Sequence, residues 1–246
     1  MKLRILQMAI AGVLVAGTGA AQAAMQIGTG LDSSGSLLGA YAADQNWTVT
    51  TTGPGNPTPT TTVSPNPLVW PNGVWPLQSG TWTPNQPNGQ WISPVDTSAA
   101  WTQPSGVTAN FSQAPNTMFY YTRTIGSGFT SISGGFSSDN PAALFLNGTQ
   151  IAASAGWSQI PTDTYDWNKW TTFSDTLSPN QSYTITVEVY NLPGGAPGNP
   201  TGLLLAGAVT PVPEPTTMVA GIGAIGLVLA GMASRSRRSS AARIGK

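Results

Sequence analysis

The chain has 246 residues, and its nine basic and nine acidic side chains leave no formal net charge. It contains neither histidine nor cysteine, which excludes Ser-His-Asp catalysis, histidine-ligated zinc and thiol chemistry. Residues 24–212 carry only two positive but eight negative side chains, a net charge of −6. Such a body has no basic stripe that could neutralise phosphates, so nucleic acid is not an expected partner.

Residues 1–23 have the pattern of a secretory signal peptide. The short basic start Met1–Arg4 precedes an apolar stretch, Ile5–Val15. Ala21 and Ala23 then supply the small residues that a signal peptidase reads, which predicts cleavage after Ala23, with Ala24 as the alternative. The apolar stretch is short for a stable membrane anchor. The pattern therefore predicts an exported protein with signal peptidase as its first partner.

The pattern of the body that follows, 24–209, predicts short strands. The first four lie at 46–51, 90–93, 118–125 and 129–136. Strand 118–125 has aromatic side chains on both faces, which leaves its buried side open. Residues 53–67 contain five prolines among threonines. Because proline removes a donor from a strand ladder and favours extended, solvated backbone, a long loop within the domain is predicted there. A domain boundary is the alternative.

The second half of the body gives clearer strand signals. Asn147-Gly148, a strong turn dipeptide, joins 142–146 to 150–153 and predicts a hairpin. Residues 182–190 alternate strictly between apolar and polar side chains, as expected of a strand with one buried face. Two more strands are predicted at 169–177 and 202–209, with a loop over 191–201. Short strands between turn signals predict an all-β fold, a single β-sandwich or jelly roll over 24–209.

The C-terminal end has three parts. Residues 210–215 contain three prolines and form a predicted stalk. The 20 residues 215–234 carry no charge, and a helix of that length spans roughly 30 Å, the thickness of a bilayer's hydrocarbon core. A transmembrane helix is therefore predicted over 216–234. The basic tail 235–246 marks the side that stays in the cytoplasm; its clustered arginines are Arg235, Arg237 and Arg238.

This order of parts resembles the PEP-CTERM sorting signal of Gram-negative bacteria. The resemblance implies that Pro213, Glu214 and Pro215 are recognised by an exosortase, a membrane-embedded protease. The arginine cluster would then retain the precursor in the inner membrane until it is cut, and the protein would be released or transferred to the cell surface. A plain C-terminal membrane anchor is the alternative. A GPI signal fits less well, because such a signal ends in its hydrophobic tail.

Four short motifs in the body are similar to those of galactose-binding-like β-sandwich domains of exported bacterial proteins. They are Asn46–Val49, Gln90–Pro94, Asp139-Asn140 ahead of 144–148, and Asn199–Leu203. The resemblance implies a jelly-roll fold, carbohydrate binding and, in many members, a structural calcium. The chain shows no run of acidic residues spaced like a calcium loop. No cofactor or metal ligand set is therefore predicted from the residues themselves.

Tryptophan is abundant, with nine residues. An aromatic face beside a few polar groups is typical of a sugar site, and the richest such cluster is Trp157, Asp163, Tyr165, Asp166, Trp167 and Trp170. The alternative is that these rings fill and cap the sandwich core.

We therefore expect a non-enzymatic protein of the cell surface or extracellular matrix, structural or adhesive in an exopolysaccharide or biofilm layer. One alternative is a plain membrane-anchored periplasmic domain. The other is a glycoside hydrolase that uses two carboxylates, with the candidates Asp139, Asp163, Asp166, Asp175 and Glu188.

Overall fold

The computed structural model describes residues 23–53, 62–72, 77, 80–95, 113–160, 166–193 and 199–213. The chain divides into two units, the body 23–212 and the two ends, 1–22 with 213–246. The predicted signal peptide before Ala23, the residues after Pro213, the membrane helix and the arginine cluster lie outside the described residues. Within the described part, no helix is both long enough and apolar enough to cross a membrane.

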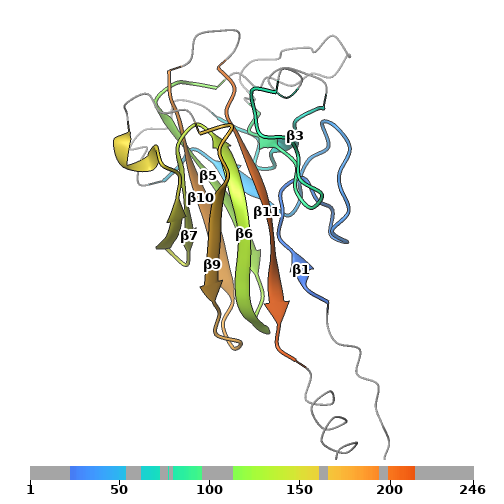
Figure 1. The fold of residues 1–246 in the computed structure, drawn as a ribbon. Coiled ribbons are helices and arrows are strands. Elements are labelled where there is room, and N and C mark those ends of the chain that lie inside the picture. Colours follow the sequence, from blue (N-terminus) through green and yellow to red (C-terminus); the bar gives the residue numbers. More distant parts are fainter. Residues whose placement is uncertain are drawn as a thin grey trace, which may run out of the picture. The chain divides into compact units, whose positions relative to one another are not determined.

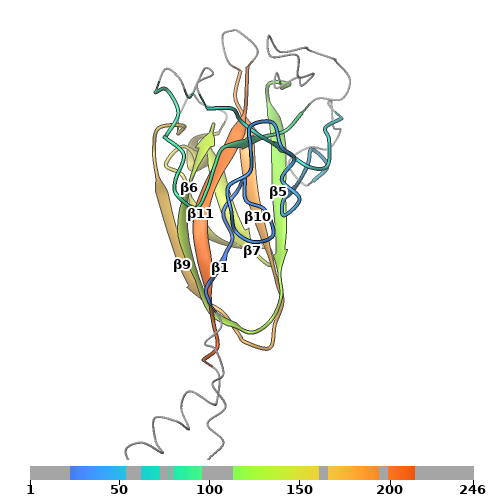
Figure 2. The ribbon, with the colours of Figure 1, turned by 90° about the vertical axis from the view of Figure 1, so that its right-hand side faces the viewer.

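The body is all-β, as predicted, and consists of two antiparallel sheets that face each other. The first sheet has the order β3-β4-β11-β6-β9, with β1 beside β11; its strands are β1 (Met25–Gln26), β3 (Leu68–Val69), β4 (Ile92–Ser93), β6 (Phe129–Asp139), β9 (Thr171–Thr176) and β11 (Gly202–Pro211). The second has the order β2-β5-β10-β7-β8; its strands are β2 (Thr48–Thr50), β5 (Thr117–Ile125), β7 (Ala142–Leu146), β8 (Thr149–Ala153) and β10 (Tyr183–Asn191). Figures 1 and 2 show the two layers.

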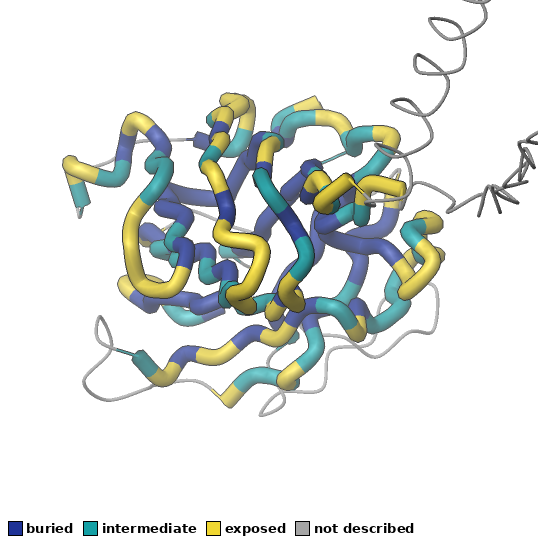
Figure 3. The backbone as a smooth tube through the Cα atoms, turned by 90° about the horizontal axis from the view of Figure 1, so that it is seen from below, coloured by how far each residue is buried: buried dark blue, intermediate teal, exposed yellow. Residues whose placement is uncertain are grey.

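The core lies between the sheets and is built by strand alternation. On β10, Ile185, Val187 and Val189 are fully buried, while the residues between them are only partly buried. The predicted buried face of this strand is therefore confirmed. Figure 3 shows buried positions gathered in the middle of the body and exposed ones toward its rim.

Strand β5 is buried on both faces over its first five residues, 117–121, which answers the question that its sequence leaves open. Phe119 and Tyr121 lie in the main core between the sheets. Tyr120 points the other way and is also buried, because Gly53 lies on its ring: a Cβ on Gly53 would come within 2.3 Å of a ring carbon. A loop thus covers the outer face of this strand.

Two features of the fold differ from the sequence predictions. The two-residue strands β1 and β3 lie outside the predicted strands, because so short a segment shows no alternation. The predicted stalk 210–215 begins inside a strand, since β11 continues to Pro211. Within the predicted loop 53–67, residues 54–61 lie outside the described residues, and 62–67 form no strand, as predicted, but they contact the body: Val49 N donates to Pro65 O over 2.8 Å, and Val63 packs against the core.

Tyr121→Phe is expected to raise the free energy of unfolding by about 1 kcal/mol, because the buried Tyr121 hydroxyl has no hydrogen-bond partner among the described residues. Urea titration measures the change. Tyr183→Phe is the matched control and should destabilise slightly, since Ser178 N donates to the Tyr183 hydroxyl over 2.7 Å. A loss of stability in Tyr121→Phe would contradict the assignment of an unsatisfied hydroxyl.

Candidate functional site

The structure separates the predicted aromatic cluster into different surroundings. Asp163 and Tyr165 lie outside the described residues. Trp157 begins a short 3-10 helix (Trp157–Gln159), half-buried, with its ring edge-on to Phe145 at a centroid distance of 6.4 Å. Trp157 therefore packs beside the hairpin of β7 and β8.

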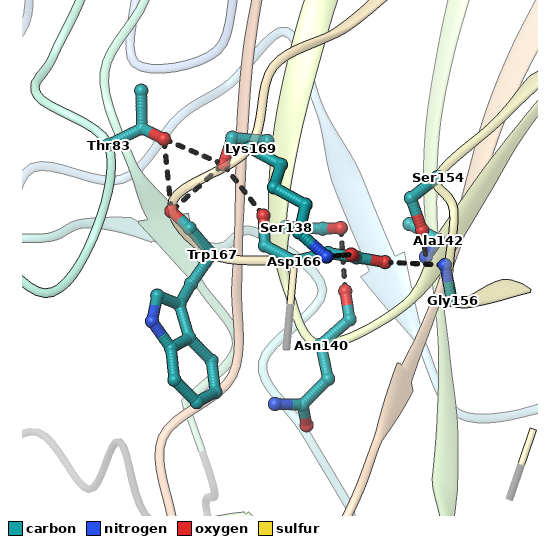
Figure 4. A network of polar contacts seen from close by, with 10 residues as sticks. Thr83, Ser138, Asn140, Ala142, Ser154, Gly156, Asp166, Trp167 and Lys169 are labelled. Carbon is teal, nitrogen blue, oxygen red and sulfur yellow. Dashed lines mark hydrogen bonds and ion pairs between the residues drawn. The ribbon is translucent and has the colours of Figure 1, made fainter. Parts of the chain in front are cut away.

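Asp166 anchors a loop. Its side chain is 1 % exposed, Oδ2 accepts a hydrogen bond from Gly156 N, and Oδ1 pairs with Lys169 Nζ, both over 3.1 Å. Figure 4 shows both contacts. Because both carboxylate oxygens already accept hydrogen bonds from the protein, this side chain suits loop support better than sugar recognition.

Trp167 is tied to the sheet through its backbone. Its carbonyl oxygen accepts hydrogen bonds from Thr83 N (2.7 Å), Thr83 Oγ1 (3.0 Å) and Ser137 Oγ (3.0 Å). Figure 4 shows the contact with the Thr83 hydroxyl. Its side chain packs against a second apolar cluster formed by Trp70, Trp82 and Trp91. For this residue, the core-filling interpretation is the better one.

Trp170 is different, because 39 % of its surface is exposed. Its indole lies directly on Gly135 of β6: a Cβ on this glycine would sit 2.3 Å from the indole Nε1. The missing side chain at position 135 therefore makes room for the ring, which lies against the sheet and keeps part of its surface open to solvent.

The strand faces beside this ring are uncharged and bear hydroxyl groups. In β6 and β9, Ile132, Phe136 and Phe173 point into the core, so the residues between them point outward. Three outward pairs lie side by side across the two strands, namely Gly135 with Thr172, Ser133 with Ser174, and Ser131 with Thr176. We call these six residues together with Trp170 the outer face.

The outer face combines an aromatic surface with small polar groups, a mixture typical of small-molecule sites. A sugar ring can lie against the indole while its hydroxyls exchange hydrogen bonds with the serine and threonine side chains. The sequence contained part of this signal, since serine and threonine recur in the predicted strands 129–136 and 169–177. The contact between Trp170 and Gly135 could not be read from it.

Three of the four motifs that resemble galactose-binding-like domains meet around Asp139. Its Oδ2 accepts a hydrogen bond from Trp82 Nε1 (3.1 Å) and its Oδ1 accepts one from Asn140 Nδ2 (2.5 Å). The Thr201 hydroxyl donates to the Asp139 carbonyl, and Ser93 Oγ donates to the Thr201 carbonyl over 2.6 Å. These motif residues are buried and join β4, β6 and β11, so they support the fold.

Burial also changes the chemistry of Asp139. It raises the pKa of this carboxyl from 3.8 to about 8, although the hydrogen bonds from Trp82 and Asn140 act in the opposite direction. Beside it, Trp82 packs between Trp70 and Trp91, with ring centroids 5.0 and 4.2 Å apart. A buried carboxyl next to packed rings is not open to a polysaccharide.

Two other carboxylates proposed for glycoside hydrolysis, Asp175 and Glu188, lie on different sheets. Asp175 is on β9 of the first sheet, where its Oδ1 accepts a hydrogen bond from Thr176 N over 2.8 Å. Glu188 is on β10 of the second sheet, on the side away from the core, and partial burial raises its pKa. Among the described residues, no group of three or more His, Cys, Asp or Glu side chains could hold a metal ion.

No protein-family model matches the chain. No curated protein matches it either. Among solved structures, the chain is similar to the K2 cleaved adhesin domain of Lys-gingipain, with 12 % identity, a TM-score of 0.36, and 76 % of this chain and 99 % of that domain covered.

Two other solved structures have lower TM-scores. A beta-glucosidase from Kluyveromyces marxianus has 14 % identity and a TM-score of 0.28, with 37 % of this chain and 11 % of the enzyme covered. The CBM36-1 domain of a multidomain xylanase from the hindgut metagenome of Trinervitermes trinervoides has 14 % identity and a TM-score of 0.22, with 46 % and 85 % covered. At these TM-scores, the neighbours support no inference about what the chain binds.

Proposed function

We propose that the chain is an exported protein of the bacterial cell surface or matrix whose β-sandwich holds polysaccharide through its outer face. The observation that carries the binding part is the exposed indole of Trp170, which lies on Gly135. Beside it, the outward residues of β6 and β9 offer hydroxyls and no charge. An uncharged face suits a neutral glycan, because no charged side chain on it would have to lose water on binding.

The sorting part of the proposal rests on the two ends of the sequence. Ala21 and Ala23 follow an apolar stretch, and Pro213, Glu214 and Pro215 precede an uncharged run and an arginine cluster. In this proposal the signal peptidase acts first. The precursor then stays in the inner membrane through 216–234 until an exosortase-type protease cuts near the Pro-Glu-Pro motif. The product is structural or adhesive within an exopolysaccharide layer.

The intact mass of the protein recovered from the surface of an exosortase-containing Gram-negative host tests the sorting. We expect a product that begins at residue 24 and ends near Pro213, without the arginine tail. Replacing Glu214 with Ala should leave the full C-terminus in place. A mature protein that retains Arg235, Arg237 and Arg238 in the unmodified chain would identify a plain membrane anchor instead.

Trp170→Ala is expected to weaken retention of the full chain in gels that contain a neutral glucan or galactan by about tenfold or more, because the substitution removes the aromatic surface. Gly135→Ala should weaken it too, since a methyl group there displaces the indole. Trp157→Ala is the control, because this ring packs on Phe145 and lies outside the outer face. Equal loss in Trp157→Ala and Trp170→Ala would argue against the outer face.

A further inference from the structure

A polar cavity of about 480 Å³ opens beside β1, where the end of β5 meets the loops 32–35 and 45–46. Its volume lies within the range of roughly 300–1,000 Å³ that is usual for small-molecule sites. The polar residues that line it include Gln26, Asp32, Ser34, Gln45, Asn46 and Arg123. None of these residues belongs to the outer face.

Arg123 is the important residue of this wall, because only one other cation, Lys169, occurs in 24–212. It pairs with Ile185 across β5 and β10, so its side chain points to the core side of the sheet. There the guanidinium donates to Gln26 O over 3.0 Å and to Gly28 O over 3.4 Å. A guanidinium has five N–H donors, so these two bonds leave donors for a ligand.

Among the described residues, no carboxylate lies in direct contact with the Arg123 guanidinium. The one ion pair there joins Lys169 to Asp166. Asp44 attracts the Arg123 guanidinium electrostatically but forms no ion pair with it; its Oδ2 accepts a hydrogen bond from Gly30 N over 2.6 Å and its Oδ1 accepts one from Asn46 N over 2.9 Å. A half-buried guanidinium that is bonded only to neutral carbonyls is suited to an anionic ligand that brings its own carboxylate.

The remaining wall is suited to hydroxyl groups. Asp32 is exposed, and its Oδ1 accepts from Ser34 N (2.8 Å), Ser34 Oγ (2.6 Å) and Ser36 N (2.9 Å), which fixes the loop. The hydrogen bond from Ser34 lowers the pKa of Asp32, so this side chain stays an ionised acceptor. An anion without hydroxyl groups would be repelled by the Asp32 carboxylate, whereas a sugar hydroxyl would donate a hydrogen bond to it.

We propose that this cavity binds a carboxylated sugar, such as a uronic acid residue. The Arg123 guanidinium takes the sugar carboxylate, and Asp32 with the amides of Gln45 and Asn46 takes the ring hydroxyls. The ligand is either a free sugar acid or one residue of an acidic polysaccharide. The site shares no residue with the outer face and does not depend on glycan binding there.

Isothermal titration of the full chain in detergent, with D-glucuronate, D-glucose, acetate and inorganic phosphate as probes, tests the assignment. We expect glucuronate to bind at least about tenfold more tightly than each of the others, since charge-assisted bonds to arginine and hydroxyl contacts act together. Binding should weaken as salt is added. An oligomer of glucuronate that binds more tightly than the monomer identifies an acidic polysaccharide as the source; equal affinity identifies the free sugar acid.

Variants on the exposed rim separate ligand recognition from folding. Gln45→Lys should raise the ratio of glucuronate affinity to glucose affinity about threefold and Gln45→Glu should lower this ratio by a similar factor, because both variants lose the same amide and differ only in charge near the sugar carboxylate. Arg123→Gln should weaken binding by about tenfold or more, while Trp170→Ala should leave it unchanged. The proposal is overturned by glucuronate that does not bind, by acetate or phosphate that binds as tightly, or by equal affinities in the two Gln45 variants.

Discussion

Asp139→Asn is expected to remove a steep loss of stability that the unmodified protein shows between about pH 4 and pH 8. The Asp139 carboxyl is nearly fully buried in the fold, and its pKa is raised from 3.8 to about 8. Between these two values the unfolded chain has released this proton while the folded chain retains it. The unfolded state therefore binds fewer protons, and the free energy of unfolding falls as the pH rises, by at most about 1.4 kcal/mol per pH unit.

Urea titrations at intervals of one pH unit, followed by tryptophan fluorescence, measure this slope. Trp82→Phe keeps an aromatic ring but removes the N–H that lowers the pKa of Asp139, so the loss of stability should extend to higher pH. Asp32→Asn is the control of opposite sign: the pKa of Asp32 is lowered from 3.8 in the fold, so this carboxyl contributes stability at neutral pH that is lost only as the pH falls below its unfolded pKa, and the substitution should leave the slope between pH 5 and pH 8 unchanged. A flat profile from pH 5 to pH 8 in the unmodified protein would show that Asp139 is not the buried acid described above.

Gly28→Ala is expected to destabilise the body by about 3 kcal/mol, at the upper end of the usual cost of overpacking. A Cβ on Gly28 would lie 1.9 Å from Asn88 O and 3.1 Å from Leu205 O. Both obstacles are backbone atoms, and the chain around Leu205 is held within the first sheet. The collision cannot be relieved by rotating a side chain, so the backbone around Gly28 and Asn88 would have to move.

Gly39→Ala is the matched control for this glycine. A Cβ on Gly39 would meet no atom within 4 Å, and the substitution reduces the freedom of the unfolded chain, which predicts no loss or a gain of a few tenths of a kcal/mol. Differential scanning calorimetry of both variants measures the contrast. Similar melting temperatures for the two alanine variants would contradict the close approach at Gly28.

The parts of the fold that local chemistry determines could be predicted from the sequence. Strand β10 lies within one residue of its predicted bounds, because the alternation of its side chains sets both its extent and its buried face. The hairpin of β7 and β8 follows from Asn147 and Gly148, whose φ angles of 48° and 79° are those that this turn dipeptide favours.

The candidate sites depend on contacts between distant segments, which no local pattern reports. The proposed binding surface of Trp170 exists only because the chain after β8 places this ring on Gly135 of β6. Arg123 is one of two cations in 24–212, but its place in a cavity depends on β1, which is too short to be recognised from the sequence. In the sequence Asp139 is one of five candidate carboxylates and part of a short motif, and only the packing of Trp82 and Thr201 around it buries the carboxyl.

Strand β11 also determines how the body would carry a mechanical load. It pairs with β6 through ten residue pairs, from Gly202 to Pro211, and β1 and β4 lie along its other edge. The hydrogen bonds of an antiparallel ladder run perpendicular to the strands, so a pull along β11 from its C-terminal end stretches many of them at once. A protein held at that end and gripped on its sandwich would resist shear, whereas a pull on the N-terminal end of β1 would peel its two pairs apart one after the other.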